Sequence, residues 1–408
     1  MDESTGGIGR RLREIRAWRG LSLRVAAELA GISAPYLSRI ERGERPVDNR
    51  RLISALADAL AVSPSELIGH PARWNDPAMA AAQATVPAVR LALIADRLGG
   101  RPAAGGSGRD VRLLSAEAER AVELRSACDL PAMGAMLPAL VADLQNVAAT
   151  SRGDDRIAAL EGLMHGYATA MTLLHMLGYQ MEAWEAATKS AEVAAELGGG
   201  WPSVAAFTLT HALLPMGTEA QEHAYRTASE AADAARDVTG QVQGDPALGA
   251  YGSLCVVSGL AAAATSRDAE AAERIAEAQQ VAQRVGECSP TVATFGPTNV
   301  AMYQMKGALE VGDFERAAQL GGRIKPDQIT SAERRAMYWI DYGRALARMR
   351  GRQQEAVEAF RSGERCAPLR VRGNVYAREA VADLLGRARR DAVGRELRGM
   401  AYRMGISA

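Results

Sequence analysis

Aromatic residues are scarce in this chain of 408 residues. Only 5% of the residues are aromatic, although 48% are hydrophobic, and runs of β-branched residues are few. Alanine and leucine favour helices, whereas sheets are enriched in aromatic and β-branched residues. The composition therefore predicts an all-α protein, and the length predicts two or more domains.

Cysteines are also few, and their spacing excludes a cysteine-based framework. Cys128, Cys255, Cys288 and Cys366 stand far apart, without a C-x-x-C pair and without histidines at ligand spacing. A disulfide scaffold is typical of short chains rich in cysteine, and a structural zinc site needs closely spaced Cys and His ligands. We expect buried thiols in a reducing compartment, and neither a metal nor a cofactor.

Motifs of catalysis and of membrane insertion are missing too. The sequence has no phosphate-binding glycine loop, no nucleophile elbow and no HExxH pattern. The apolar stretch at residues 254–264, which we take as the longest, is too short to span a bilayer, and no signal peptide begins the chain. We therefore expect a cytoplasmic protein that is not an enzyme and has no membrane partner.

Positive and negative charges balance overall but not along the chain. Residues 8–51 hold eleven arginines against five acidic residues, a net charge of +6, so the rest of the chain carries −6. A basic end on an acidic body favours a polyanion as the partner of the N-terminal segment. A solvated arginine-rich face is the plainer alternative.

The N-terminal segment divides into five short helical stretches. The first, at residues 8–19, has an apolar face made of Ile8, Leu12, Ile15 and Trp18. Serines mark the start of three others: Ser22 before residues 23–30, Ser33 before 34–42, and Ser63 before a helix that opens with Pro64. The fourth starts near Asp48 and carries Leu52, Leu56 and Leu60.

Four residues of this segment have the spacing of a helix-turn-helix. Ala27 permits close approach of two helices, and Gly31 adopts a left-handed turn at little cost. Leu37 and Ile40 lie three residues apart and anchor one face of the second helix. Residues 8–69 thereby resemble the XRE family, the repressor-like domains of bacteria and phages. LSRIERGERP, at residues 37–46, is the most specific part of the match.

The resemblance implies that the helix at residues 34–42 enters the major groove of DNA. Its expected base contacts are Ala34, Pro35, Tyr36, Ser38 and Arg39. Arg39 is expected to bind guanine through two hydrogen bonds. The expected phosphate contacts are Ser22, Arg24, Asn49 and Arg50. For the arginines the alternative is a solvated charge, and for Tyr36 it is packing on the preceding helix. The chain departs from the family pattern at Leu23, where many members have glutamine, and at Pro46, which stands one residue early.

The rest of the chain contains degenerate repeats. GYQMEAWEAA (178–187), GDFERAAQL (312–320) and GRQQEAVEAF (351–360) each place an alanine five residues after a glycine. Phe360 and Pro368 follow at offsets expected of a tetratricopeptide unit. We predict a tetratricopeptide-like α-solenoid of helix pairs, with a plain helical bundle as the alternative.

In a tetratricopeptide unit a glycine ends the first helix of the pair. Counting back from that glycine gives the side chains expected to face the concave groove. This register gives the expected ligand-binding residues His165, His175, Phe207, His211, Asn299, Met302, Lys306, Tyr338 and Asp341. Asn374, near the start of the last helix pair, is expected to play the same part. An amide such as that of Asn299 both donates to and accepts from a peptide backbone. The histidines invite a metal or pH site, but no carboxylate stands at ligand spacing, so we expect none.

The combination of the two parts resembles the peptide-sensing regulators of Gram-positive bacteria known as RRNPP proteins, and their actinobacterial relatives. We expect a DNA-binding domain at residues 1–72, a linker helix and flexible loop at 73–109, and a ligand-sensing and dimerisation domain at 110–408. The resemblance implies a homodimeric transcriptional regulator on a pseudo-palindromic operator, controlled by a peptide or small-molecule effector, as in quorum sensing. The alternative is a protein-interaction module whose DNA binding is secondary.

Overall fold

The computed structural model describes residues 7–69, 76–95, 109–239, 246–287, 295–388 and 394–406, and nearly all of them lie in helices. The expected all-α fold is confirmed. The first helices are α1 (Ile8–Trp18), α2 (Leu23–Leu29), α3 (Ala34–Glu41), α4 (Arg50–Leu60) and α5 (Pro64–Ile68).

Side-chain caps fix where these short helices begin. Ser22, Ser33 and Ser63 each accept a hydrogen bond from the backbone of the first turn, as the sequence predicts. The fourth helix begins at Arg50 rather than near Asp48, because the side chain of Asn49 caps it by accepting from Leu52. The caps therefore set the direction in which α2, α3 and α4 point.

The first five helices share a hydrophobic core of their own. Ile8, Leu12, Leu37 and Ile40 are each at most 1% exposed. Gly31 has a φ of 66°, the left-handed conformation that the turn between α2 and α3 requires. Trp18 departs from expectation: it is 79% exposed, because α1 ends there and its ring lies against Arg19 instead of the core.

Gly9 brings α1 and α3 together. A Cβ at this position would collide with the backbone oxygen of Ile40, which no rotamer change relieves. We expect Gly9→Ala to lower the free energy of unfolding by about 3 kcal/mol, the upper end for overpacking. Gly386→Ala is the matched control, because that helical glycine has open space around it, and alanine there is expected to stabilise by about 0.5–1 kcal/mol. Urea unfolding of both variants checks this, and equal effects would contradict it.

The remaining helices form one continuous array. They are α6 (Pro77–Ala84), α7 (Val86–Ile94), α8 (Val111–Ala127), α9 (Leu130–Thr150), α10 (Gly153–Met176), α11 (Gln180–Leu197), α12 (Trp201–Leu213), α13 (Thr218–Thr239), α14 (Pro246–Ala264), α15 (Asp268–Val285), α16 (Pro297–Glu310), α17 (Phe314–Gly321), α18 (Ala332–Ala347), α19 (Gln353–Cys366), α20 (Pro368–Gly373), α21 (Val375–Ala388) and α22 (Gly394–Arg403), with a short 3₁₀ turn at Pro326–Gln328.

Successive helices of the array pack against each other, and glycine turns join several pairs. Four of these turns hold a glycine with positive φ: Gly178, Gly217, Gly312 and Gly351. The alanines that follow in three of the repeats are completely buried: Ala183, Ala317 and Ala356. Glycine thus reverses the chain and alanine permits close packing, so the helical region is consistent with a solenoid.

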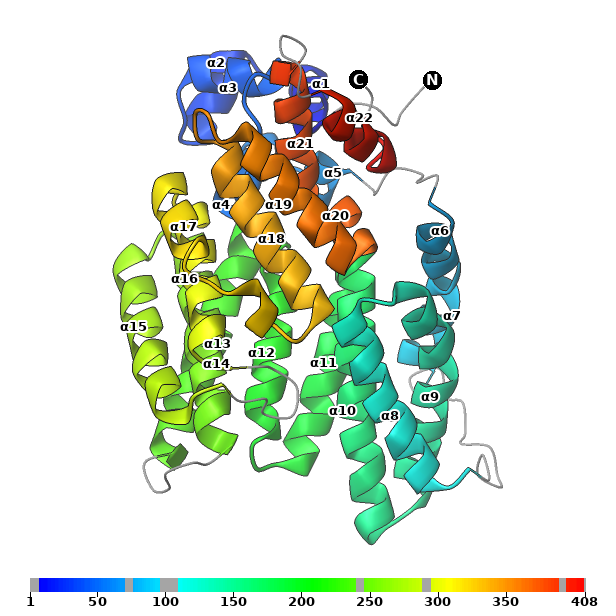
Figure 1. The fold of residues 1–408 in the computed structure, drawn as a ribbon. Helices are drawn as coiled ribbons and strands as arrows, with labels where there is room; N and C mark the ends of the chain where they lie inside the picture. The colour runs from blue at the N-terminus through cyan, green and yellow to red at the C-terminus, as the bar shows by residue number, and fades with distance from the viewer. Residues whose placement is uncertain are drawn as a thin grey trace.

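The array curls back on itself. Helix α18 packs against α8, which lies more than two hundred residues earlier in the chain, and Ser331 Oγ donates a hydrogen bond to the backbone oxygen of Ser126 at 3.2 Å. The N-terminal helices lie at one end of the array, beside α21 and α22 (Figure 1). Val375 and Tyr376 pack against their core. The two parts of the chain are therefore in direct contact.

Helices α6 and α7 differ from the expected linker. Both pack against α9 and share its core, so residues 76–95 belong to the array. Close packing is favoured by Gly134, where a Cβ would collide with Thr85. The glycine- and proline-rich loop at 101–108 and the expected boundary near residue 72 lie outside the described residues.

Two segments of the described chain are long and apolar enough to cross a membrane by length and composition. They are Pro77–Ile94 and Leu130–Thr150, with mean hydropathies of 1.3 and 1.2. The expectation that residues 254–264 form the longest apolar stretch is therefore wrong. The two segments pack against each other, and 33% and 39% of their residues are buried within the fold.

Candidate nucleic-acid interface and central cavity

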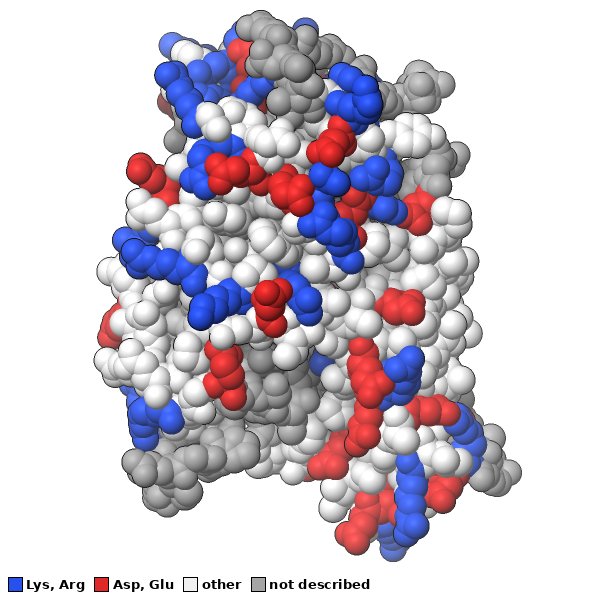
Figure 2. Space-filling view, viewed as in Figure 1, with Lys and Arg blue, Asp and Glu red and all other residues white. Residues whose placement is uncertain are grey.

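Helix α3 presents one face to solvent. Pro35 and Arg39 are exposed, while Ala34 and Ser38 are half-buried. The Arg39 guanidinium makes no hydrogen bond or ion pair with any residue that the structure describes, whereas Ser38 Oγ accepts one from Arg42 at 2.9 Å. Lys and Arg side chains gather at the end of the molecule where α2 and α3 lie (Figure 2). This face has the charge and the free donors that a nucleic acid requires.

Tyr36 lies on a different face from Arg39. It is half-buried against the core of the N-terminal helices. Burial raises the pKa of its phenol, and the nearby Asp48 carboxylate adds to that rise. Tyr36 therefore contributes to the packing of the N-terminal helices, and the base contact expected of it stays a prediction.

The expected phosphate contacts divide into two groups. Ser22 and Asn49 cap α2 and α4, so their oxygens already accept backbone hydrogen bonds. Arg24 is exposed and its guanidinium has no partner among the described residues, and the same is true of Arg51, which sequence reasoning missed. Arg24 and Arg51 are thus the cations of this group that a phosphate can reach.

Arg50 does not project into solvent. Its backbone N–H donates to Glu310 Oε2 at 2.9 Å, and its guanidinium pairs with the other oxygen of the same carboxylate. Glu310 ends α16 and is 3% exposed. A carboxylate is favoured at a helix N-terminus, here that of α4, because the unpaired N–H groups and the helix dipole attract negative charge. The phosphate contact expected of Arg50 is therefore occupied in this structure by a carboxylate of the array.

Further polar contacts hold the N-terminal helices on the array. Arg344 of α18 donates both to the backbone oxygen of Asp48 and to Asp341 Oδ1, the latter at 2.6 Å. Arg348 pairs with the Asp48 carboxylate at 3.1 Å. Burial raises the pKa of Asp48, although both arginines oppose that rise. The domain interface is thus built from desolvated charges as well as apolar contacts.

Arg39 is expected to contact a base, whereas Arg24 is expected to contact a phosphate, and the two substitutions should therefore differ in effect. We expect Arg39→Ala to relax discrimination at one base pair, at a cost of about 1–3 kcal/mol for the preferred sequence. Arg24→Ala is the control, because a lost phosphate contact weakens binding to all sequences alike and lowers the salt slope by about one. Competition binding with operator and mismatched duplexes at several salt concentrations measures both. Identical behaviour of the two variants would contradict the assignment of Arg39 to a base and Arg24 to a phosphate.

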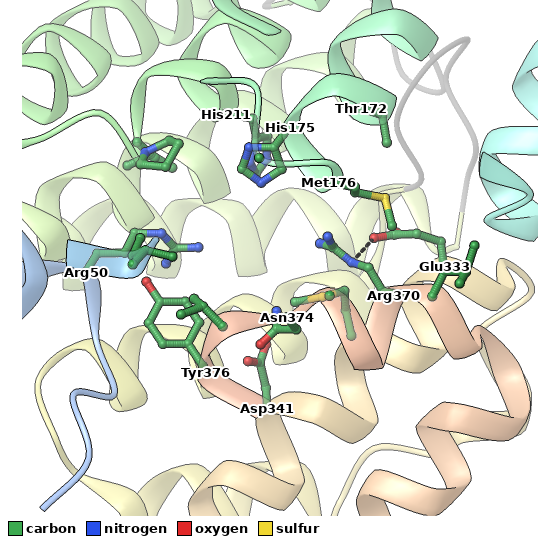
Figure 3. A pocket seen from close by; sticks show the side chains of 18 of the residues that line it. Arg50, Thr172, His175, Met176, His211, Glu333, Asp341, Arg370, Asn374 and Tyr376 are labelled. Atoms are coloured by element: carbon green, nitrogen blue, oxygen red, sulfur yellow. Dashed lines mark ion pairs between the residues drawn. The ribbon is translucent and has the colours of Figure 1, made fainter. Parts of the chain in front are cut away.

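A central cavity of about 560 Å³ lies between the array and the N-terminal helices. Helices α8, α10, α12, α16, α18, α20 and α21 form most of its wall, and Arg11, Arg50 and residues near Ile68 complete it. Figure 3 shows labelled side chains from several of these helices around the shared space. The volume lies in the range of small-molecule sites, about 300–1,000 Å³.

The structure brings eight of the ten expected groove residues to this cavity. They are His175, Phe207, His211, Asn299, Met302, Lys306, Asp341 and Asn374. His165 is placed elsewhere, with its ring edge against Trp201. Tyr338 also points away and donates to the backbone oxygen of Gly321 at 3.1 Å, because the register of α18 turns its neighbour Met337 inward instead.

Sequence reasoning missed most of the charged residues of the wall. Arg125, Arg334, Arg370 and Arg378 line the cavity, as does Glu333, which pairs with Arg370 at 2.9 Å (Figure 3). Arg370, Asn374 and Arg378 are spaced four residues apart across the junction of α20 and α21. That spacing is the signal that the sequence offers for these side chains.

The two histidines of the cavity are neutral near pH 7. Burial, and after it the charge of Arg370, lower the pKa of His175 to about 4. Burial and the charge of Lys306 lower the pKa of His211, whose Nε2 is hydrogen-bonded to Tyr303 Oη at 3.0 Å. Within the described ranges no group of three or more His, Cys, Asp or Glu side chains is placed to hold a metal ion.

Comparison with known proteins identifies the N-terminal part. A family model described as a helix-turn-helix domain matches residues 8–67, which span α1 to α5. The helix α2, the turn at Gly31 and the helix α3 have the geometry of a helix-turn-helix. Together with this match, they indicate a DNA-binding regulator. No curated protein and no solved structure matches the chain.

Proposed function

We propose that this protein is a sequence-specific transcriptional regulator whose DNA binding is controlled by a peptide or small-molecule effector in the central cavity. The helix-turn-helix domain supplies the DNA-binding surface. The cavity is walled on one side by that same domain, through Arg11 and Arg50, and on the others by the array. An effector in the cavity therefore touches the DNA-binding domain directly.

The observation that carries this proposal is the contact between Glu310 and the start of α4. The Glu310 carboxylate accepts a hydrogen bond from the backbone N–H of Arg50 and pairs with its guanidinium. Both donors would suit a DNA phosphate. In the docked arrangement this part of the domain is withheld from DNA. An effector that binds the docked state more tightly lowers the population that can bind DNA, and one that binds the released state more tightly raises it.

The regulator is further proposed to act as a homodimer in the cytoplasm. One helix-turn-helix reads only a few base pairs, so two half-sites about one helical turn apart are needed for useful specificity. The free Arg39 is the strongest base-reading donor on α3. An operator with partial two-fold symmetry follows from this arrangement.

Selection from random duplex DNA tests the proposed function. The full-length protein is expected to enrich one partly palindromic sequence, with binding that weakens as salt rises. Fluorescence anisotropy then gives the affinity for that sequence and for a scrambled one. Selection that enriches no sequence would overturn the proposal, and the recovery of one stoichiometric protein partner from a pull-down would then favour the interaction module.

A further inference from the structure

We propose that the central cavity binds a small organic anion that carries carboxylate or phosphate groups. This inference rests on the proposed function, since it assigns the chemistry of the effector to the same cavity. Three features of the wall support it: its net charge, two donors without hydrogen-bond partners among the described residues, and its apolar side chains.

The wall of the cavity carries an excess of positive charge. Its cationic side chains are Arg11, Arg50, Arg125, Lys306, Arg334, Arg344, Arg370 and Arg378. Its carboxylates are Glu333, Asp341 and Glu379. The net charge of the wall is thus +5, or +4 when Glu310, the partner of Arg50, is included. Desolvated charge of one sign is costly unless opposite charge compensates it, so an anion fits this cavity.

The acidic residues of the wall already have cationic partners. Asp341 pairs with Arg344, and Glu333 pairs with Arg370. Glu379 accepts a hydrogen bond from the backbone N–H of Ile8 at 3.0 Å and lies close to Arg11 and Arg378. None of these hydrogen bonds and ion pairs among the described residues involves Lys306.

Lys306 is a cation of the cavity wall whose ammonium group lies over the Tyr303 ring. Its ammonium group makes no hydrogen bond or ion pair within the part of the chain that the structure describes, and lies 5.3 Å from the centre of the Tyr303 ring. Burial lowers the pKa of Lys306 to about 8, with Asp341 opposing and Arg50 and Arg370 contributing. A protonated amine that makes no hydrogen bond or ion pair among the described residues and lies among other cations is suited to contact an anion.

Amide and apolar groups complete the site. The side-chain oxygen of Asn374 caps α21 by accepting from Ala377 at 2.9 Å, and its amide nitrogen has no partner among the described residues. Phe207, Met302 and Met337 supply apolar surface on other parts of the wall. The site thus combines donors for an anionic group with a surface for the carbon skeleton that bears it.

Titration of Lys306 gives the site a pH dependence. An anion raises the pKa of Lys306, so binding takes up a proton when the pH lies above about 8. We expect affinity to be constant below that pH and to fall up to about tenfold per pH unit above it. The charged and titratable groups around Lys306 are Arg50, His175, His211, Tyr303, Glu333, Asp341 and Arg370. The two histidines stay neutral across this window, and the phenol of Tyr303 titrates well above it, with a pKa raised to about 12.

The test uses citrate and inorganic pyrophosphate as probes, with chloride at matched ionic strength as the reference. Isothermal titration and thermal unfolding of the full-length protein, without DNA, give the affinity of each probe. At least one probe is expected to bind saturably and to raise the unfolding temperature. Binding of pyrophosphate alone assigns a phosphate ligand, and binding of citrate alone assigns a carboxylate.

Matched lysine variants locate the site. Lys306→Gln is expected to weaken the binding of the probe at least tenfold at pH 7 and to abolish the loss of affinity above pH 8. Lys325→Gln, at an exposed lysine without a partner among the described residues, is expected to bind as the wild type does. Binding of neither probe, or equal binding by both variants, would overturn this inference. Because no DNA is present, either result leaves the proposed DNA-binding function to be judged by operator selection alone.

Discussion

Glu310→Gln is expected to destabilise the docking of the helix-turn-helix domain on the array by about 3–5 kcal/mol, the usual effect of removing one partner of a buried ion pair. Glutamine retains the volume of the side chain but leaves the Arg50 guanidinium without a counter-charge. The unfolding temperature is expected to fall, and small-angle scattering is expected to show a larger radius of gyration as the domain detaches.

Glu315→Gln is the matched control for that experiment. Glu315 lies in the first turn of α17, five residues from Glu310, but it is exposed and has no ion-pair partner among the described residues. Its replacement is expected to change stability by less than about 0.5 kcal/mol, as for other surface positions. Equal effects of the two substitutions would show that the contact with Arg50 does not hold the domain in place.

The second large effect is expected at Arg344. Arg344→Met leaves the carboxylate of Asp341, which is 1% exposed, without its partner and removes a hydrogen bond to the backbone of Asp48. A loss of about 3–5 kcal/mol in the free energy of unfolding follows from the buried, unpaired charge. Chemical denaturation of the single and double variants measures it.

The double variant separates charge from packing. Arg344→Met combined with Asp341→Leu is expected to recover most of the lost stability, because both charges are then replaced by apolar groups of similar volume. Arg120→Met provides the exposed control: Arg120 pairs with Glu123 at the same three-residue spacing, and its loss is expected to cost less than about 0.5 kcal/mol. A double variant as unstable as Arg344→Met would instead assign the loss to the contact with Asp48.

The N-terminal domain could be predicted from the sequence because local signals define it. Serine caps, the left-handed glycine at position 31 and the spacing of Leu37 and Ile40 act within a few residues of each other. Seven of the nine residues expected from the helix-ending glycines lie on the wall of the cavity for the same reason, since a glycine that ends a helix fixes which side chains on that helix face inward. Ligand binding by these residues stays a prediction. His165 lies on the same face of α10 as Ala168, Thr172 and His175 but beyond the end of the cavity, where it contacts Trp201. At Tyr338 the register differs by one residue, and Met337 lines the wall instead.

The domain interface could not be predicted, because it depends on contacts between distant parts of the chain. Arg50 and Glu310 are separated by 260 residues, and nothing in the sequence near either one indicates the other. The closure of the array through α8 and α18 is equally nonlocal, and it turns an expected open groove into a cavity. The positive charge of that cavity comes from arginines on several helices, each of which resembles a solvated surface residue in the sequence.

The affinity of the selected operator for Glu310→Gln, relative to the wild type and to Glu315→Gln, tests the central claim most directly. If docking withholds the start of α4 from DNA, Glu310→Gln binds the operator more tightly, by a factor of about 5 to 150 for a coupling of 1–3 kcal/mol, and Glu315→Gln binds as the wild type does. Equal affinities of all three proteins in fluorescence anisotropy would contradict the claim that the array controls DNA binding through Arg50.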